Sequence, residues 1–474
     1  MKVLAIVPAR GGSKRIPRKN LKELLGRPLI AYAILEARKA RCVDRVVVST
    51  DDREIAGVAR SYGAEVPFLR PPELSTDEAS TVSVLAHAME ELRAVEGYEP
   101  DFVLVLQPTS PLRTAEEIEA AVDLAVRNGA ESLVSVSESL VPPQFLMRVT
   151  DDSLVPVVPP VEKNFRKQDL PRTFQLNGSI YLDTPSFLAR NRSLRGRETV
   201  PLVTSKFTAV DVDDQFDWTV AEGLLRSRNL ENKRPVTVGR VDLRDVDLFV
   251  GLRPPKSSAG EIRRWVESAA ALGVDVLNLG VLTTEECHAL ENVAIPEHVA
   301  TVVGVEDSRQ AGAAELIEPG AYEIAPSRLT PDLAALLGSA KKPTFLRVKG
   351  EPLVEVDLAV NALERSGVNE ILLLHECDAR PSRVERWNEA FPYLQGASVG
   401  WLQGDAGDGS ERSLASACCA ACWGAKYLEL RWPADSRERE SARLLKKLVQ
   451  TTSTVREVAK WRRPALAGRG VEEG

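Results

Sequence analysis

Short apolar runs alternate with amphipathic helical segments along most of this 474-residue chain, and this alternation limits the folds open to it. Up to residue 230, the strand candidates are Val3–Pro8, Arg45–Thr50, Phe102–Gln107, Ser132–Val136 and Ser179–Leu182. Amphipathic helices fit around residues 29–41, 52–62, 79–95 and 114–128. Apolar strands that alternate with helices favour a mostly parallel sheet covered on both faces. The first half is therefore predicted to be an α/β sandwich.

The second half repeats the same alternation more regularly. Its eight short apolar runs are Asp247–Leu252, Val274–Gly280, Val299–Val305, Ala321–Ala325, Pro343–Val348, Glu370–His375, Ala397–Leu402 and Lys426–Arg431. Helical patterns separate most of these runs, which favours a (β/α)₈ barrel of the TIM type. A chain of this length is expected to form more than one domain. We predict domains at 1–230 and 241–474, joined by a polar linker at 231–240.

Composition excludes several classes of protein. The formal net charge of −7 argues against nucleic acid as the main partner. No apolar run approaches the roughly 18–20 residues of a membrane span. The chain enters its first strand directly after Met1, without a signal-peptide pattern, and its 6 cysteines form no disulfide framework. Cys418, Cys419 and Cys422 lie in an Ala-rich helical run, which favours core residues over a metal or redox site. We expect a cytoplasmic protein.

A basic, glycine-containing loop follows the first strand. It runs from Arg10 to Asn20 and carries the pair Gly11-Gly12. Open α/β sheets bind ligands at the carboxyl ends of their strands, where turn N–H groups hold anions. Arg10, Lys14 and Lys19 can add full charges around a triphosphate. The loop thus predicts a nucleotide phosphate site that differs from the ATPase P-loop; a solvated basic loop is the alternative.

Two other polar segments lie where a ligand crevice is expected. Gln107-Pro108-Thr109-Ser110-Pro111-Leu112-Arg113 follows the apolar strand at Phe102, and a proline-stiffened turn explains it equally well. In Val210–Asp214, strand alternation places Asp211 and Asp213 on one face. Two such carboxylates need a cation between them, and Mg²⁺ favours a few carboxylates with phosphate oxygens. The alternative is an exposed acidic turn.

Together these segments resemble the acylneuraminate cytidylyltransferases, the CMP–sialic acid synthetases. The resemblance spans about residues 1–228 and keeps the order of the family's motifs. These motifs are Arg10-Gly11-Gly12-Ser13-Lys14 with Lys19-Asn20, Gln107–Arg113, Asn177-Gly178-Ser179-Ile180-Tyr181 and Asp211-Val212-Asp213. It implies that the anomeric hydroxyl of a 2-keto-3-deoxy sugar acid attacks the α-phosphate of CTP, giving a CMP-sugar and pyrophosphate.

The resemblance also implies a role for each matched residue. The expected triphosphate loop consists of Arg10, Gly11, Gly12, Ser13, Lys14, Lys19 and Asn20. Arg70 and Thr81 match positions that recognise the cytosine base, and Asp211 and Asp213 match the Mg²⁺ ligands. The expected sugar contacts are Gln107, Lys167, Gln168 and Asn177. The expected catalytic residues are Arg10, Lys19 and Asp211. The resemblance implies that Asp211 also helps to activate the hydroxyl.

The sugar-binding half departs from the family's pattern. Lys167 stands where an arginine commonly binds the sugar carboxylate, and lysine lacks the two-pronged guanidinium. Gln175 replaces another arginine, and Val141–Phe145 lacks a basic residue sometimes present there. Arg166 and Arg172 are candidates to compensate. The sugar is therefore open between N-acetylneuraminic acid and a related nonulosonic acid.

The second half resembles, more weakly, the barrel of sialic acid synthases, which condense phosphoenolpyruvate with an amino sugar. Matched residue by residue, most of the catalytic set is missing. Asn278 stands for a family lysine, Glu323 and Arg328 stand for a lysine and a glutamate, and Gly404 stands for a metal ligand that would pair with His375. We expect a non-catalytic barrel that acts as a scaffold. The competing hypothesis is a ligand site at its carboxyl face, formed by Arg253, Lys256, Arg328, Lys349 and His375.

Three further expectations follow. The chain is a bifunctional enzyme if the barrel has kept an activity, or a CTP-binding regulator if the first domain has lost turnover. Family resemblance implies a homodimer, with residues 137–175 as an arm between subunits. The barrel is also a candidate for association with a sialic acid synthase-type enzyme.

Overall fold

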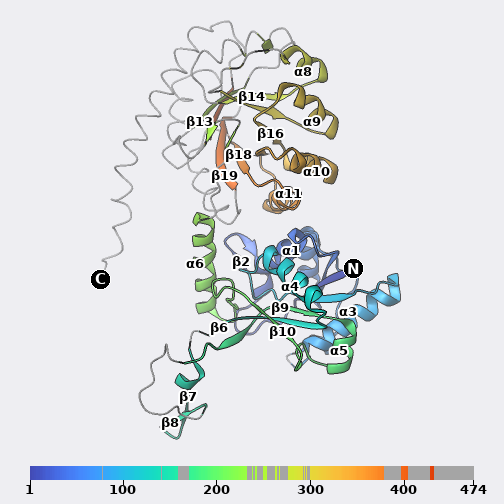
Figure 1. The fold of residues 1–474 in the computed structure, drawn as a ribbon, viewed down its shortest axis with the longest axis vertical. Helices are drawn as coiled ribbons and strands as arrows, with labels where there is room; N and C mark the ends of the chain where they lie inside the picture. The colour runs from blue at the N-terminus through green and yellow to red at the C-terminus, as the bar shows by residue number, and fades with distance from the viewer. Residues whose placement is uncertain are drawn as a thin grey trace, which may run out of the picture. The chain divides into compact units, whose positions relative to one another are not determined.

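The chain folds into two compact units in the computed structural model, Met1–Ser227 and Arg228–Gly474 (Figure 1). The structure describes residues 1–76, 78–139, 141–158, 170–231, 237–238, 241–242, 249–253, 262–263, 266, 276–291, 293, 295, 299–377, 397–403 and 427–431. Most of the predicted linker lies outside these residues. Each unit is described by itself below.

The first unit is built on a 6-stranded sheet with the order β10-β6-β9-β5-β1-β4. Its strands are β1 (Val3–Pro8), β4 (Arg45–Ser49), β5 (Phe102–Val105), β6 (Ser132–Glu138), β9 (Phe174–Asp183) and β10 (Val200–Val203). All are parallel except β9, which runs antiparallel to both β5 and β6. The predicted mostly parallel sheet is present, and the reversed strand and β10 were not foreseen.

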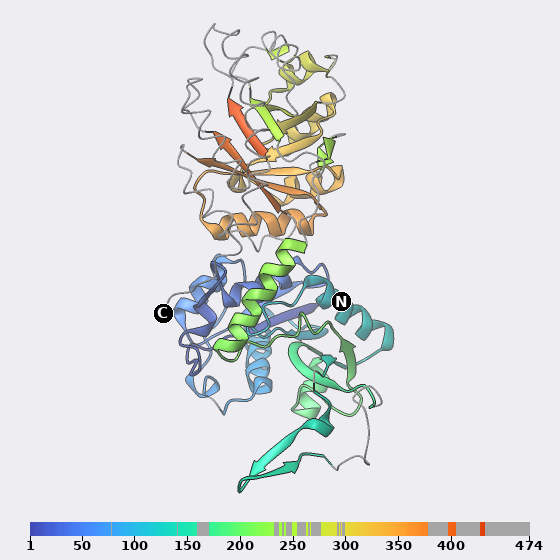
Figure 2. The same cartoon turned by 90° about the vertical axis from the view of Figure 1, so that its left-hand side faces the viewer.

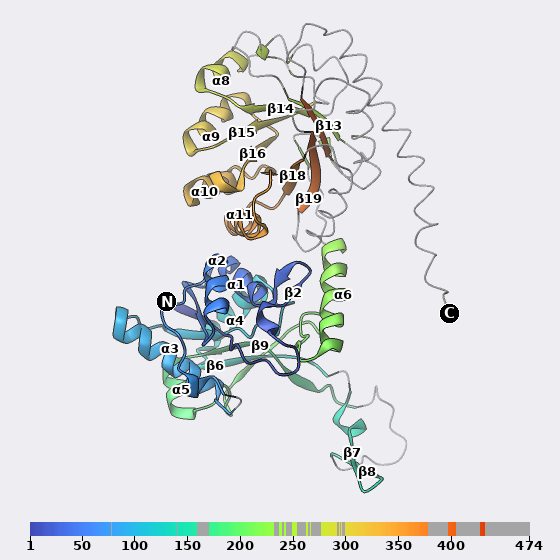
Figure 3. The ribbon, with the colours of Figure 1, turned by 180° about the vertical axis from the view of Figure 1, so that it is seen from behind.

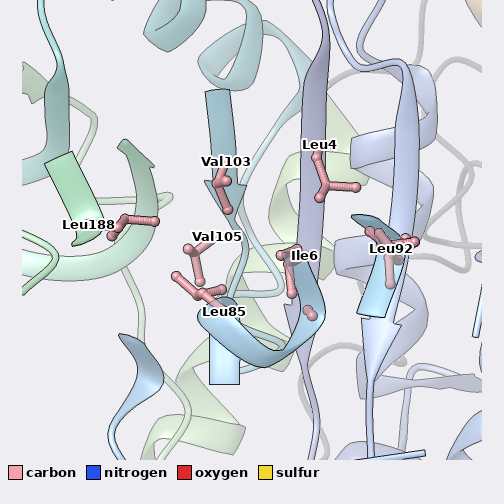
Figure 4. Close-up of a cluster of buried hydrophobic side chains, with 9 residues drawn as sticks. Leu4, Ile6, Leu85, Leu92, Val103, Val105 and Leu188 are labelled. Carbon is pink, nitrogen blue, oxygen red and sulfur yellow. The ribbon is translucent and has the colours of Figure 1, made fainter. Parts of the chain in front are cut away.

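Helices cover both faces of this sheet. The four predicted helices are α1 (Leu29–Lys39), α2 (Arg53–Ser61), α3 (Thr81–Glu96) and α4 (Ala115–Asn128). On one face, α3 and α5 (Pro185–Asn191) pack on β1 and β5 through buried side chains such as Leu4, Val105 and Leu85 (Figure 4). On the other, α1 and α6 (Gln215–Glu231) share a cluster around Leu29 and Trp218. The apolar alternation therefore produces two cores, one on each side of the strands.

A hairpin of β7 (Met147–Thr150) and β8 (Ser153–Pro156) extends away from this sheet (Figures 2 and 3). All of its side chains are exposed. The exposed large apolar side chains of this segment are Val141, Phe145, Leu146, Met147, Val149, Leu154, Val155 and Val157. This surface belongs to the segment at 137–175 that the sequence singled out.

In the second unit, eight strands form a closed barrel from β13 to β20. They are β13 (Phe249–Arg253), β14 (Val276–Val281), β15 (Ala300–Gly304), β16 (Ala321–Ile324), β17 (Thr344–Val348), β18 (Ile371–Cys377), β19 (Ala397–Gln403) and β20 (Tyr427–Arg431). Neighbouring strands are parallel throughout. Four helices lie outside strands β14–β18 (Figure 1): α8 (Thr284–Leu290), α9 (Ser308–Ala314), α10 (Pro331–Ala340) and α11 (Leu353–Arg365).

The barrel interior combines an apolar layer with a polar group. Val276, Ala321 and Phe345 belong to one buried cluster that joins successive strands, which places it inside. Asn278, Glu323 and Arg347 lie two residues further along the same strands and so share that face. Polar residues thus begin towards the carboxyl end, the usual ligand end of such barrels.

One local prediction was wrong. Residues 210–213 do not form a strand. Val212 is buried beside Trp218, and its N–H donates to the carbonyl of Thr109 at 2.7 Å. The alternating pattern therefore reflects one buried side chain in an extended loop.

Within the described residues, no helix combines the length and apolarity needed to cross a membrane.

Candidate active site

The predicted site residues of the first unit gather at one edge of the sheet. The parallel register of β1 with β4 and β5 brings the carboxyl ends of these strands together at Pro8, Ser49 and Val105. Because β9 runs the other way, its amino end reaches the same edge with Asn177. Loops from four strands therefore meet where open α/β sheets bind ligands.

The basic loop is held in place by the neighbouring strand. Gly11 N–H donates to Asp51 Oδ1 at 3.0 Å, and Asn20 Nδ2 donates to the carbonyl of Arg10 at 3.0 Å. A Cβ atom on Gly11 would lie 2.8 Å from Asp52 Oδ2, whereas one on Gly12 would have no neighbour within 4 Å. The first glycine is thus required by packing, and the second leaves open space at the loop's surface.

This loop also contacts the predicted metal ligands. Lys19 Nζ donates to the carbonyl of Val212 at 2.8 Å and lies 3.3 Å from Asp213 Oδ1. Arg15 Nη1 lies 3.1 Å from Asp213 Oδ2. The structure therefore brings together two motifs that are nearly 200 positions apart, and their roles in phosphate and metal binding stay predictions. Arg15 was not assigned a role from the sequence, although its place within the basic loop was a signal.

Asp211 combines a solvent-facing side with a crowded one. Partial burial raises the pKa of its carboxyl, and the nearby charge of Asp213 acts in the same direction. A hydrogen bond with Thr109 and the charge of Lys19 oppose this rise. A carboxylate of raised pKa accepts a proton more readily. Asp211 is therefore suited to activate a hydroxyl group.

Asp211 and Asp213 are the predicted ligands of a magnesium ion. In the described ranges, no group of three or more His, Cys, Asp or Glu side chains is placed to hold a metal ion. Asp211 and Asp213 can supply two oxygen ligands, and Mg²⁺ commonly completes its shell with phosphate oxygens and water. The pair fits Mg²⁺ only in company with a phosphate-bearing ligand.

The predicted base-recognition residues lie beyond β4. Arg70 is buried; its Nε donates to Ser49 Oγ at 3.1 Å, and its Nη2 bonds to the Ser49 carbonyl. Burial lowers the pKa of Arg70 to about 10, so the guanidinium stays charged at neutral pH. Thr81 is the first residue of α3 and is partly exposed.

Of the predicted sugar contacts, Gln107 and Asn177 are described, whereas Lys167 and Gln168 lie outside the described residues. Gln107 is partly buried at the end of β5. The Asn177 amide is occupied by the protein itself: Oδ1 accepts from Ser135 Oγ at 2.6 Å, and Nδ2 donates to Thr204 Oγ1 at 2.8 Å. Asn177 therefore positions β9 here, and its contact with sugar stays a prediction.

Sequence reasoning missed Arg113 as a functional candidate. Its side chain is 1% exposed and joins the segment after β5 to β9, with Nη2 donating to the Gln107 carbonyl at 2.6 Å. The only sequence signal was its place at the end of the Gln107–Arg113 motif. An arginine in a polar turn is usually solvated, so its burial was not predictable from pattern.

In the barrel, the residues that depart from the synthase pattern are paired with one another. Asn278 Nδ2 bonds to Glu323, and Arg347 Nη1 lies 3.2 Å from Glu323 Oε1. Arg328 and Lys349 are exposed. Cys418, Cys419, Cys422, Lys256 and Gly404 lie outside the described residues, as do the side chains of Arg253 and His375.

Comparison with known proteins shows a family for the N-terminal half. A family model described as cytidylyltransferase matches residues 4–194. CMP-N,N'-diacetyllegionaminic acid synthase of Legionella pneumophila is 37% identical over 230 residues, covering 48% of this chain and 97% of that protein. Pseudaminic acid cytidylyltransferase of Campylobacter jejuni is 38% identical over 226 residues, covering 48% and 97%.

Several solved structures each align with about half of the chain. N-acetylneuraminic acid synthetase of Leptospira borgpetersenii covers 51% of this chain and 93% of its own, with 14% identity and a TM-score of 0.39. A likeness this weak gives no basis for assigning an activity to the barrel.

Proposed function

Since the chain belongs, through its N-terminal half, to the family of cytidylyltransferases that activate nonulosonic acids, we propose that it transfers CMP from CTP to the anomeric hydroxyl of such an acid. The new bond joins the anomeric oxygen to the α-phosphorus, and the bond from that phosphorus to the leaving pyrophosphate breaks. The observation that carries the proposal is the meeting of Lys19, Asp211 and Asp213 beside the glycine loop.

Each part of the site has a task in this reaction. Arg10, Lys14 and Lys19 balance the negative charge of the triphosphate and of the departing pyrophosphate. Asp211 takes the proton of the anomeric hydroxyl, a role that its raised pKa supports. Asp211 and Asp213 would hold Mg²⁺, which neutralises charge on phosphate oxygens when bound. Arg70 and Thr81 are assigned to the base, and Gln107, Lys167, Gln168 and Asn177 to the sugar.

The decisive experiment is a panel of acceptors. The full chain is incubated with CTP and Mg²⁺ and with N-acetylneuraminic, legionaminic or pseudaminic acid, and pyrophosphate release is measured. We expect release with at least one acid and little with UTP in place of CTP. Tight CTP binding without release for any acid would instead favour a CTP-binding regulator.

We propose that the hairpin arm carries a homodimer contact. The apolar side chains listed above for residues 141–157 would be covered by a second copy of the chain. Val149→Asp is expected to shift sedimentation towards the monomer. Val95→Asp is the matched control, because Val95 is equally exposed, at 74% against 73%, on α3. A wild-type chain that sediments as a monomer at high concentration would contradict the dimer.

For the second unit we propose a complete (β/α)₈ barrel without catalytic activity. The mutual pairing of Asn278, Glu323 and Arg347 supports this proposal, because these groups satisfy one another inside the barrel. Such a barrel would serve as a scaffold, including for a sialic acid synthase-type partner. Condensation of phosphoenolpyruvate with an amino sugar by the purified chain would show a bifunctional enzyme and refute the scaffold.

A further inference from the structure

We propose that Arg113 is a positioning residue for the acceptor sugar: it fixes the two strand ends that flank the sugar site and holds a permanent positive charge beneath them. The inference rests on the proposed function, because it names a residue that serves the acceptor half of that site. It assigns Arg113 no direct contact with substrate.

The hydrogen bonds of Arg113 connect two segments far apart in sequence. Its Nη2 donates to the Gln107 carbonyl at 2.6 Å, and its Nε donates to the Ser179 carbonyl at 2.9 Å. Nε also lies 3.3 Å from Ser179 Oγ. Gln107 ends the β5 segment, and Ser179 lies two residues after Asn177 in β9. β5 and β9 already pair directly, and one planar guanidinium adds a link between the segment after β5 and the part of β9 that carries Asn177.

A second network fixes β9 from its other side. Ser135 Oγ, on β6, donates to Asn177 Oδ1, and the Ser179 N–H donates to the same oxygen at 3.2 Å. Thr204 Oγ1 accepts from Asn177 Nδ2. Arg113 on the β5 side and Ser135 on the β6 side therefore hold the segment Asn177–Ser179 by hydrogen bonds from both neighbours. Such rigid support is what a precisely oriented acceptor requires.

The charge of Arg113 is unusual for a purely structural residue. Burial lowers the pKa of Arg113 to about 10, which leaves it charged at neutral pH. Among the described residues, it has no carboxylate within ion-pair distance, and its Nη1 is buried without a hydrogen bond. Glu117, Glu36 and Asp211 act on it only through space. A buried cation without a direct ion pair costs stability, so a neutral side chain would serve better if only packing mattered.

The chemistry of the proposed acceptor explains that charge. A nonulosonic acid brings a carboxylate to this edge of the sheet, and the field of a buried cation is weakly screened. Arg113 therefore favours the anionic acceptor through space, while its hydrogen bonds hold Gln107 and Asn177 in register. The CTP loop has cations of its own, so the effect should concern the sugar much more than the nucleotide.

The test separates the Michaelis constants of the two substrates in the full chain. Arg113→Lys keeps the charge but not both hydrogen bonds, and Arg113→Met removes both. We expect the KM for the sugar acid to rise about tenfold in Arg113→Lys, because Gln107 and Asn177 lose their fixed positions, and further in Arg113→Met, because the charge is lost as well. The KM for CTP should change by less than about twofold. Arg127→Met is the control, since Arg127 is an exposed arginine on α4.

A milder variant keeps the test decisive if Arg113→Met does not fold. Ser179→Ala removes only the hydroxyl acceptor, and we expect a smaller rise in the sugar KM with CTP binding unchanged. Equal rises in both KM values, or wild-type kinetics in Arg113→Lys and Ser179→Ala, would overturn the inference. Failure of the proposed function looks different, because the wild-type chain would then release no pyrophosphate with any acid.

Discussion

The first unit and the barrel both place charged side chains towards the carboxyl ends of parallel strands, but the charges have different partners. In the first unit, Lys19 and Asp213 lie on separate loops at a partly exposed edge, with Asp213 53% exposed. In the barrel, Glu323 is 2% exposed and is bonded by Asn278 and Arg347. Both sets of charges are paired, but Asp213 at the first edge remains accessible to a ligand, whereas Glu323 in the barrel is buried against its partners.

This difference separates polar groups that can bind a ligand from polar groups that only stabilise the fold. Polar groups that meet a ligand need geometry fixed from behind, which Arg113 and Asn177 supply from beneath the first edge. Polar groups that meet only each other contribute to the barrel's packing, and their loss should be felt as instability. Substitutions in the two units should therefore give different kinds of defect.

The largest effect is expected at Asp211. Asp211→Asn keeps the size of the side chain but removes its ability to accept a proton, so kcat for cytidylyl transfer should fall roughly 10³-fold. The unfolding midpoint should change little, because Asp211 is an exposed side chain and asparagine keeps its size. Pyrophosphate release and thermal unfolding are the measurements. Activity near the wild-type level would exclude Asp211 as the base.

Glu323 tests the other side of the comparison. Glu323→Gln leaves the Arg347 charge without its partner, so we expect the barrel to lose about 2–3 kcal/mol. This lies below the usual cost of breaking a buried pair because the Arg347 side chain is 24% exposed. Urea unfolding of the full chain measures the loss, with the exposed Glu306→Gln as control. A fall in cytidylyl transfer without destabilisation would instead indicate that the barrel regulates the first unit.

Substitutions of the two glycines of the basic loop should also give two kinds of defect, one in stability and one in CTP binding. Gly11→Ala forces Asp52 to move, and Asp52 Oδ1 caps α2 by accepting from the N–H groups of Glu54 and Ile55. We expect a loss of about 1 kcal/mol of stability, the usual cost of a broken helix cap. Gly12→Ala has open space and should leave stability unchanged while weakening CTP binding. Calorimetric unfolding and CTP titration distinguish them, and equal stabilities would contradict the packing argument.

The strands could be predicted from the sequence because burial on both faces leaves continuous apolar runs. The same reasoning located all eight barrel strands to within a few residues. It did not reveal the reversal of β9, because chain direction within a sheet is decided by connections and leaves no mark on the pattern. Nor did it give residues 210–213 correctly, since one buried valine in a loop imitates a strand.

The site was predictable where chemistry requires charge in a local motif. The loop from Arg10 to Asn20 and the pair Asp211 and Asp213 were predicted from the sequence, and the structure places the loop in contact with Asp213, while their functional roles stay predictions. Arg15 and Arg113 were missed because their partners lie 198 and 66 positions away, beyond any local pattern. Asn177 shows the converse: its motif was identified, but its amide is engaged within the protein.

Asp183 gives the most specific prediction, because it is a buried carboxyl group without an ion pair among the described residues. It ends β9 at the edge of the sheet opposite the site, and neither carboxylate oxygen has a hydrogen bond of good geometry. Burial raises the pKa of Asp183 to about 7, and nearby Ser132 only partly opposes this. The folded state therefore holds a proton that the unfolded chain, with a pKa near 3.8, releases.

The contribution of Asp183 to stability should accordingly fall as the pH rises from about 4 to 7, because over this range its carboxyl group holds more of its proton in the folded state than in the unfolded one. Asp183→Asn removes the titrating group and keeps its shape. The variant should match wild type near pH 4 and be more stable above pH 7, as measured by urea unfolding across this range. If the difference in unfolding free energy between wild type and Asp183→Asn stayed constant with pH, Asp183 would have a partner that stabilises its charge. The first unit would then also pair its buried charges away from the site.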